Sequence, residues 1–246
     1  MKKVLIASGC SFTFEAWNWP GHLGRDIGVE IINVGMGSQG NGLISRKLIY
    51  AVENALRKYT PDEILVGVMW SGTDRSEYHT YDGSDVLHWG FSNKPGNIKN
   101  PTNVVKGHYN WRIMNHHWSN KESLNYYENF HTAIYGMVST IEHVLRVQWY
   151  LKHLGIDYFM STYMDIFGDK VLTENREVDH LFKMINFDKF LPIKGCYEWV
   201  LEHYKDKNGF PQADENGYVG KHPSSFGHRK FSEEVIIPYL KEKNLI

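Results

Sequence analysis

Apolar residues follow two different spacings along the chain, and together these spacings predict alternating strands and helices. Four short apolar runs, rich in β-branched residues, are typical of buried strands, and each run ends in small or polar residues. The runs are Lys3–Ala7, Val29–Val34, Glu63–Trp70 and Asp157–Thr162. Between the runs, apolar residues recur every three or four positions, which is the spacing of one helix face.

Three helices are predicted by this second spacing. The first follows the glycine-rich residues 35–42 and ends before Pro61. The second ends near Gly155, a residue suited to the left-handed conformation that closes many helices. The third runs from about Phe226 to Lys243, and we expect Pro238 to kink it. The apolar positions that define the three helices are Ile44, Leu48, Val52 and Ala55, then Ile134, Val138, Ile141 and Leu145, then Phe231, Val235 and Leu240.

Strands that alternate with helices predict a parallel sheet with right-handed crossovers and helices on both faces. We therefore expect an α/β fold, a three-layer α/β/α sandwich with a central parallel sheet in a flavodoxin-like arrangement. Ligands of such folds bind outside the carboxyl ends of the strands. The length of 246 residues suits a single domain with a sizeable core, and residues 1–246 are expected to form it.

Residues 77–129 interrupt the alternation, because they are rich in Tyr, Trp, His and Asn and show little apolar periodicity. A loop of this length in a compact domain is usually functional or mobile. The insertion would leave the third strand at the ligand-binding edge. We expect either a lid or substrate platform, or a surface insertion packed by its own aromatic residues, such as Trp89, Trp111 and Trp118.

Charge and composition exclude several classes of protein. The formal net charge is −1, so no overall field attracts nucleic acid or an anionic membrane, and neither partner is expected. No apolar run approaches the roughly 20 residues that cross a bilayer. The two cysteines, Cys10 and Cys196, lie far apart in the sequence and do not support a disulfide framework.

The first ten residues are similar to a lipoprotein signal that ends at Cys10. Their apolar stretch is shorter than the roughly 7–15 residues that such a signal needs, so we interpret it as the first strand. No signal peptide or transmembrane segment is expected, and a cytoplasmic location is the default expectation. The oligomeric state has no signature in the sequence.

Two residues near opposite ends of the chain suggest nucleophilic catalysis. Ser11 follows the first strand directly, and His222 precedes Pro223 shortly before the last helix. A serine hydroxyl is a poor nucleophile until a base takes its proton, and histidine is the usual base. As a simpler alternative, Ser11 could cap a helix that begins near Phe14. We interpret His228 as a helix-start residue.

The order of these segments resembles the SGNH (GDSL-type) hydrolase superfamily over nearly the whole chain. Gly9-Cys10-Ser11 resembles its first block, Asn33 to Ser38 its second, and His222-Pro223 its last. The resemblance implies that Ser11 is the nucleophile and His222 the base. It also implies that backbone N–H groups of Ser11 and of Gly37 or Ser38 bind the oxyanion.

Three positions depart from the superfamily pattern. Cys10 replaces an aspartate that is not itself catalytic. Trp70 to Arg75 replaces the third block, so the side-chain amide that assists the oxyanion is missing there. Val219 replaces the triad acid. Candidate replacements for the amide are Asn41 and a hydroxyl of Ser71 or Thr73, and Gly72 is a further candidate contact of the third block. Candidates to hold the imidazole are Asp214, Glu215 or a main-chain carbonyl.

The resemblance implies a serine esterase or deacylase that hydrolyses a carboxylic ester through an acyl-serine intermediate. The expected substrate is a small-molecule or glycan ester, possible examples being carbohydrate O-acetyl esters. Two alternatives stay open: a catalytically weakened binding or structural module, and an acyltransferase. No metal or other cofactor is expected, because His108, His116, His117 and His131 lack a ligand spacing and no nucleotide-binding glycine motif is present.

Overall fold

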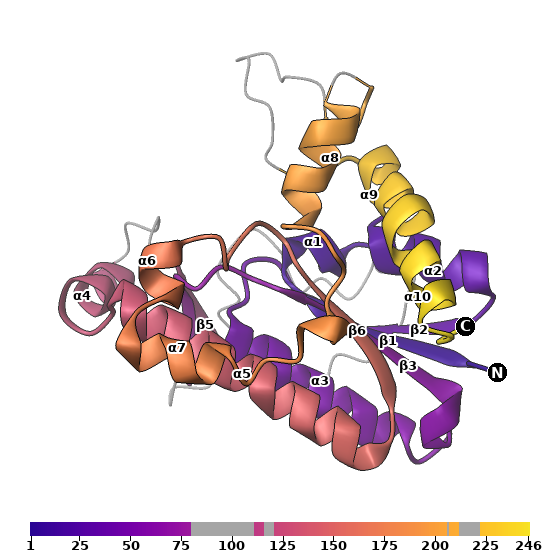
Figure 1. Cartoon of the computed structure of the whole chain (residues 1–246), viewed down its shortest axis with the longest axis horizontal. Helices are drawn as coiled ribbons and strands as arrows, with labels where there is room; N and C mark the ends of the chain where they lie inside the picture. Colours follow the sequence, from indigo (N-terminus) through magenta and orange to yellow (C-terminus); the bar gives the residue numbers. More distant parts are fainter. Residues whose placement is uncertain (80–110, 116–120, 206, 212–221) are drawn as a thin grey trace.

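The computed structural model describes residues 1–79, 111–115, 121–205, 207–211 and 222–246. Its centre is a four-stranded, fully parallel sheet with the strand order β2-β1-β3-β6 (Figure 1). The strands are β1 (Val4–Gly9), β2 (Glu30–Asn33), β3 (Ile64–Trp70) and β6 (Asp157–Thr162). Each strand lies within about two residues of the apolar run that predicted it, and the expected three-layer α/β/α fold is confirmed.

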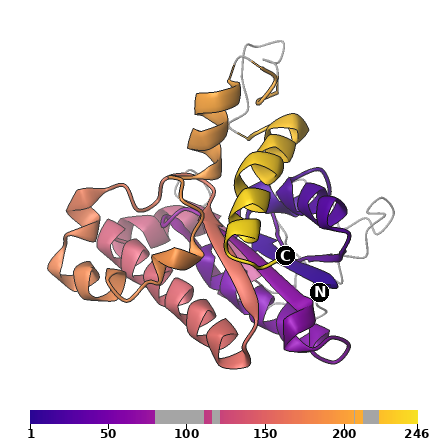
Figure 2. The same cartoon turned by 45° about the vertical axis from the view of Figure 1, so that its right-hand side comes forward.

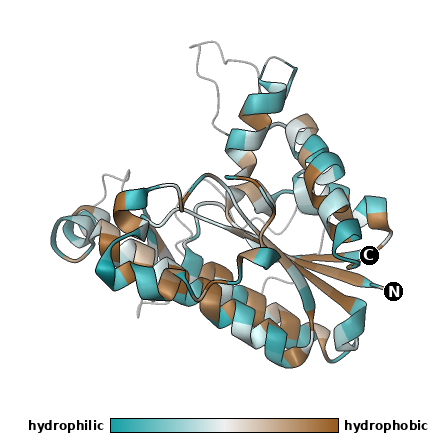
Figure 3. Ribbon diagram, in the orientation of Figure 1, coloured by the Kyte–Doolittle hydropathy of each residue, from teal (hydrophilic) through white to brown (hydrophobic). Residues whose placement is uncertain are grey.

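The strands are apolar throughout because both faces of the sheet are buried. Val4 and Ile6 of β1 pack in the core on one face, whereas Leu5 and Ala7 pack in a second core on the other. Side chains of a strand alternate between the two faces, so a continuous apolar run serves both cores at once. Figure 3 shows the strands as hydrophobic and the outward surfaces of many helices as hydrophilic.

One face of the sheet is covered by α3 (Asn41–Ala55), α5 (Ala133–Leu154), α6 (Lys170–Thr173) and α7 (Arg176–Phe182). Gly155 closes α5 in the left-handed conformation, with φ of 67°, as predicted. None of the described helices is long and apolar enough to cross a membrane.

The other face is covered by α2 (Trp19–Ile27), α8 (Cys196–Tyr204) and the C-terminal helices (Figure 2). Two short 3-10 helices, η1 (Pro61–Glu63) and η2 (Phe187–Lys189), complete the connections near the sheet. At Gly67 of β3, an added Cβ would lie 2.7 Å from both Trp19 and Phe159. The missing side chain therefore lets α2 pack closely against the sheet.

The last helix differs from the single kinked helix that the sequence predicted. It consists of α9 (Ser225–Phe231), a π-helical turn η3 (Ser232–Ile236) and α10 (Ile237–Glu242). Pro238 stands in the first turn of α10, where its missing N–H costs little. The helix is therefore irregular at the π turn, whereas we had expected a kink at the proline.

The region 77–129 has more regular structure than the sequence indicated. An antiparallel pair joins β4 (Arg75–His79) to β5 (Trp111–Asn115), and α4 (Lys121–Asn129) follows. Its pairing depends on residues distant in the sequence, which local periodicity does not reveal. Residues 80–110 and 116–120, and with them Trp89, Trp118, His108, His116 and His117, lie outside the described residues.

Candidate active site

Ser11 lies at the carboxyl end of β1, on a tight turn into the one-turn helix α1 (Ser11–Phe14). The N–H groups of Thr13 and Phe14 donate to the carbonyl oxygen of Cys10, at 2.9 and 3.1 Å. Gly9 is required here, because a Cβ at this position would lie 2.2 Å from Thr13 Oγ1 and 2.8 Å from the Met69 carbonyl oxygen. The strand therefore passes into the turn without a side chain in the way.

Side chains from neighbouring segments hold this turn in place. Asn33, the last residue of β2, donates from Nδ2 to the carbonyl oxygens of Thr13 and Phe14, at 2.6 and 3.2 Å. Asn18 Nδ2 donates to the carbonyl oxygen of Ser11 itself, at 2.8 Å. Because Asn18 and Asn33 are buried, these bonds are shielded from water and fix the serine backbone.

The structure brings Ser11 and His222 together. Ser11 Oγ and His222 Nε2 lie 2.7 Å apart, which is hydrogen-bond distance. Cys10, not Ser11, occupies the position before the first turn of α1, so the alternative that Ser11 serves as a helix cap does not describe this turn. The imidazole also lies against the ring of Phe12, with 4.9 Å between ring centroids.

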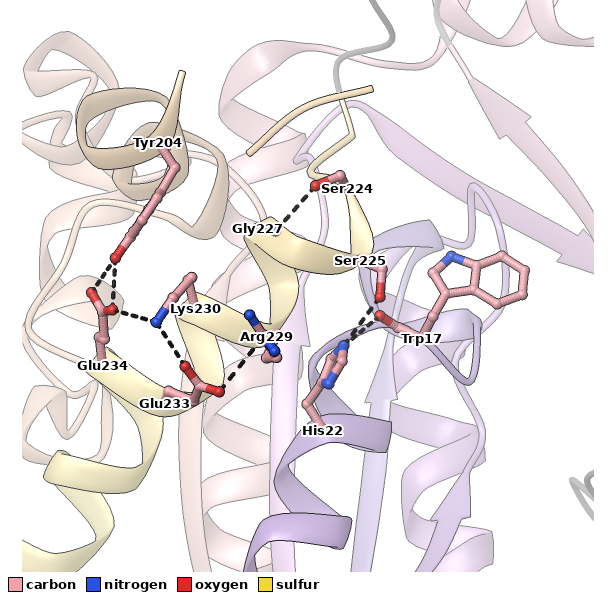
Figure 4. A network of polar contacts seen from close by, with 10 residues as sticks. All are labelled: Trp17, His22, Tyr204, Ser224, Ser225, Gly227, Arg229, Lys230, Glu233 and Glu234. Carbon is pink, nitrogen blue, oxygen red and sulfur yellow. Dashed lines mark hydrogen bonds and ion pairs between the residues drawn. The ribbon is translucent and has the colours of Figure 1, made fainter. Parts of the chain in front are cut away.

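His222 is positioned by the start of α9, which two serines anchor (Figure 4). Ser224 caps the helix by accepting a hydrogen bond from the N–H of Gly227, at 3.1 Å. Ser225 Oγ lies 3.3 Å from Nε2 of His22, so the first turn of α9 is joined to α2. The loop that contains His222 is therefore followed by a helix whose first turn is anchored.

A chain of polar contacts further along the same helices joins α9 and η3 to α8. Tyr204 donates to the Glu234 carboxylate at 2.6 Å, and Lys230 contacts both Glu234 and Glu233 (Figure 4). These groups are largely exposed, so each pair contributes little on its own. Their effect is on the placement of α8 relative to α9, the helix that contains His228 and follows the His222 loop.

The electrostatic surroundings favour a neutral imidazole at His222. Partial burial lowers the pKa of His222, and the positive charge of Arg75 lowers it further. A neutral imidazole can accept the serine proton at Nε2, provided that Nδ1 carries the other proton. Among the described residues, Nδ1 has no hydrogen-bond partner, and the proposed orienting residues Asp214 and Glu215 lie outside that part of the chain.

The turn after β2 lies beside the serine turn. The N–H of Met36 and Nε2 of Gln39 both donate to the carbonyl oxygen of Gly9, at 3.1 and 2.5 Å. Gly37 and Ser38 lie between these two anchors, and Ser38 adopts a positive φ of 61°. The two candidate oxyanion residues are thereby tied to the end of β1, next to Ser11.

Asn41 has a structural role in this arrangement. Its Nδ2 donates to the Ser71 carbonyl oxygen at 3.1 Å and to Thr140 Oγ1 at 3.0 Å, while its Oδ1 accepts from the Ser71 N–H at 2.8 Å. Both amide protons are used, so this side chain has none left for an oxyanion. Asn41 instead fixes the end of β3 to the start of α3. The main-chain carbonyl oxygen of Thr73 lies 3.3 Å from His131 Nε2.

Arg75 is the site residue that sequence reasoning missed. It begins β4, and its Nη1 donates to Ser71 Oγ at 2.8 Å. Its guanidinium carbon lies 4.9 Å from the centre of the Tyr163 ring, within cation–π distance. The sequence shows that the segment Trp70 to Arg75 lacks a side-chain amide. The positive charge of Arg75 at the end of that segment did not enter the prediction of the site.

Cys10 and Cys196 are both buried free thiols in the same hydrophobic core. Cys10 is therefore a packed core residue rather than a thiol that faces the site. His228 is also fully buried, in α9 and against Phe12, whose ring centroid lies 6.0 Å from that of His228. From the sequence, His228 is expected to be a helix-start residue, and the structure places it as the fourth residue of α9. Its Nδ1 has no hydrogen-bond partner among the described residues.

Burial of His228 predicts a loss of stability in mild acid. Desolvation, then the charges of His22 and His222, lowers the pKa of His228 to about 3. Below the ordinary histidine pKa near 6.5 the unfolded chain binds a proton that the folded chain does not. The free energy of unfolding should therefore fall as the pH drops, by about 2 kcal/mol from this group at pH 5.

Urea unfolding between pH 5 and 8 measures this effect. The His228→Gln variant should show a smaller dependence of unfolding free energy on pH than the wild-type protein. Equal pH dependence in the two proteins would contradict the assignment. His22, whose pKa burial also lowers, contributes in the same direction to both proteins and cancels in the comparison.

Two hollows lie on the described surface, and neither is lined by Ser11 or His222. The larger, about 960 Å³, lies among β6, η2, α8 and α10. The smaller, about 670 Å³, is lined by Thr73 and Arg75 and continues to Tyr126, Tyr135 and Glu142. We consider the smaller one the relevant cavity, because it is lined by Arg75, whose charge lowers the pKa of His222. The described residues contain no group of three or more side chains suited to hold a metal ion.

Comparisons with known proteins place the chain in a family without assigning it a function. No curated protein matches it. The solved structure of TesA is 11% identical, with a TM-score of 0.49 over 99% of this chain and 100% of that one. A protein of Desulfitobacterium hafniense DCB-2, described as of the lipolytic G-D-S-L family, is 12% identical, with a TM-score of 0.45 and full coverage of both chains. Residues 7–173, which include Ser11 and Arg75 but not His222, match the family of unknown function DUF6071, and the chain belongs to that family.

Proposed function

We propose that this protein is a serine hydrolase of the SGNH type that cleaves a carboxylic ester. The observation that carries the proposal is the 2.7 Å contact between Ser11 Oγ and His222 Nε2 at the carboxyl edge of the sheet. Nucleophile and base within hydrogen-bond distance are the minimal requirement for covalent acyl chemistry. The lowered pKa of His222 supports the proposal, because it keeps the base unprotonated near neutral pH.

In the proposed reaction, Ser11 Oγ bonds to the ester carbonyl carbon while His222 takes the hydroxyl proton. The tetrahedral intermediate then expels the alcohol, which receives that proton from His222, and the acyl group remains on the serine. A water molecule, deprotonated by His222, attacks the acyl carbon and releases the acid. The Ser11 N–H is a natural oxyanion donor, because it lies in the first turn of α1, where backbone N–H groups lack helical partners.

A small polar ester is the substrate class that the cavity supports. The hollow of about 670 Å³ is lined by hydroxyl, amide and carboxylate groups together with Tyr126 and Tyr135. Aromatic rings beside hydroxyl-binding side chains suit an O-acylated sugar better than a long acyl chain. Transfer of the acyl group to another alcohol would use the same serine and histidine and differ only in the acceptor.

One observation favours the alternative of a catalytically weakened module. Without an acceptor at Nδ1, the imidazole is free to adopt the wrong tautomer, and the described residues supply no such acceptor. Val219, where the SGNH pattern has an acid, cannot accept a hydrogen bond through its side chain. We give this alternative second place, because Ser11 Oγ and His222 Nε2 lie within hydrogen-bond distance.

Labelling with a fluorophosphonate tests the proposal directly, because this probe reacts with activated serines and not with ordinary ones. The folded protein should take up one equivalent of probe, and peptide mass spectrometry should locate it on Ser11. The His222→Ala variant and the urea-unfolded wild-type protein should both resist labelling. An unlabelled Ser11 in the folded wild-type protein would overturn the proposed function.

A further inference from the structure

Arg75 carries a positive charge to the candidate site, where its contacts among the described residues are with neutral groups. Arg75 is partly buried, and its contacts are the Ser71 hydroxyl at 2.8 Å and the Tyr163 ring at 4.9 Å. Among the described residues, no Asp or Glu forms an ion pair with it, whereas Arg46 pairs with Glu77 at 2.6 Å in the same region. Arg75 is therefore fixed by neutral groups.

A partly buried cation of this kind is costly unless an anion accompanies it. Burial by itself lowers the pKa of Arg75, but the nearby Cys10, Tyr163 and Asp74 outweigh this effect and raise it. The guanidinium thus stays charged while none of these neighbours forms an ion pair with it. An anion that forms only during the reaction would pair with the guanidinium, and it would be absent from the site in the free protein.

Ring contacts connect Arg75 to the side of the site that holds His222. Its guanidinium carbon lies 4.9 Å from the Tyr163 ring, the Tyr163 ring lies 5.4 Å from that of Phe12, and the Phe12 ring lies 4.9 Å from the imidazole. Cys10, which lies beside the guanidinium, directly precedes Ser11. The charge of Arg75 also reaches His222, whose pKa it lowers. Arg75 also follows the end of β3, the segment in which the SGNH pattern has its side-chain amide and this chain has none.

We propose that Arg75 is a catalytic residue whose guanidinium donates hydrogen bonds to the oxyanion of the tetrahedral intermediate. This inference rests on the proposed function and replaces the missing amide with a charged donor. As Ser11 Oγ bonds to the carbonyl carbon, the carbon–oxygen π electrons move onto the carbonyl oxygen, and the guanidinium stabilises that charge without giving up a proton. The electrons return when the alcohol leaves. Ser71 and Tyr163 hold the donor ready before the charge develops.

Steady-state kinetics of Arg75→Gln on a neutral nitrophenyl ester tests the inference. Loss of one oxyanion donor should lower kcat by about 10²–10³-fold with little change in KM. The matched variant Arg57→Gln, which removes an exposed arginine of the same surface charge, should keep wild-type kinetics. If Arg75→Gln does not fold, as judged by circular dichroism and Tm, Arg75→Met takes its place, because it keeps an apolar stem against Tyr163.

An anionic ester distinguishes oxyanion binding from recognition of a charged substrate. If Arg75 binds the oxyanion, kcat should fall by the same factor on neutral and anionic esters. A rise in KM confined to the anionic ester, with kcat unchanged on the neutral one, would overturn the inference. A purely structural role predicts a fall in Tm without the selective fall in kcat, and that result would overturn it as well.

Two further measurements distinguish a catalytic role of Arg75 from a purely structural one. Methylguanidinium added at millimolar concentrations should restore part of kcat to the Arg75→Ala variant and not to Ser11→Ala. The affinity for an alkyl boronic acid, which mimics the tetrahedral intermediate, should fall in Arg75→Gln by the same factor as kcat/KM. Absence of both effects would contradict the inference. Fluorophosphonate labelling of Ser11 in the wild-type protein separates this failure from a failure of the proposed function.

Discussion

Replacement of Ser11 by alanine should abolish ester hydrolysis, with a fall in kcat of about 10⁴-fold or more. The change removes Oγ, the protein atom that forms a covalent bond to the acyl group in the proposed reaction. The turn should survive, because its hydrogen bonds come from Asn18, Asn33 and the backbone and not from the serine hydroxyl. Hydrolysis of a nitrophenyl acetate, with Tm measured on the same samples, checks both statements.

Cys10→Ala is the informative companion to this variant, because it changes the adjacent nucleophile-type side chain. Cys10 is fully buried, so a thiolate there has no access to substrate. The cysteine variant should therefore retain activity to within about tenfold, the loss reflecting packing alone. A dead Cys10→Ala protein beside an active Ser11→Ala protein would show that the nucleophile is wrongly assigned.

Replacement of His222 by alanine should lower kcat nearly as much, by about 10³–10⁴-fold. Without the imidazole at 2.7 Å, the Ser11 hydroxyl has no base and reverts to an ordinary alcohol. Because the two residues act as one unit, the Ser11→Ala/His222→Ala double variant should be no slower than the worse single variant. Kinetics of the three proteins on one ester give this comparison directly.

An exposed histidine provides the control for this variant. His153, on the outer face of α5, lies away from the carboxyl edge of the sheet, and His153→Ala should keep wild-type activity. Added imidazole should restore part of the activity to His222→Ala and none to Ser11→Ala. Additive losses in the double variant, or full activity in His222→Ala, would separate the two residues and contradict a shared mechanism.

The elements that the sequence predicted correctly are those whose pattern is local. Continuous apolar runs marked β1 and β3 because both of their faces are buried, and Gly155 marked the end of α5 because glycine readily adopts positive φ. The helices α2 and α8 were missed. Their first residues, Trp19 and Cys196, are buried by contacts with distant parts of the chain, and such contacts leave no periodicity in short segments.

Some residues of the candidate site could likewise be predicted from local sequence motifs, and others could not. Ser11 and His222 could be named in advance because each stands beside a short motif in a fixed order. The roles of Asn41 and Arg75 could not, because they depend on where the end of β3 meets α3 and Tyr163 in space. An asparagine near a glycine-rich turn suggests an oxyanion donor, and only its partners show that its protons are already used. For Arg75, the available sequence signal was a positively charged residue within the third block, which here lacks the side-chain amide of the SGNH pattern.

The contact between Ser11 and His222 joins positions 211 residues apart. During synthesis, the segment that holds Ser11 is therefore made well before the segment that holds His222. Pairing across such a sequence distance is slow to form, because much of the chain must fold before the ends meet. Under the proposed function, Ser11 gains its base only when the segment that precedes α9 has docked, so acyl chemistry would begin late in folding. Reactivity at Ser11 would thus report, in a time-resolved refolding experiment, the moment at which the two ends of the chain come together.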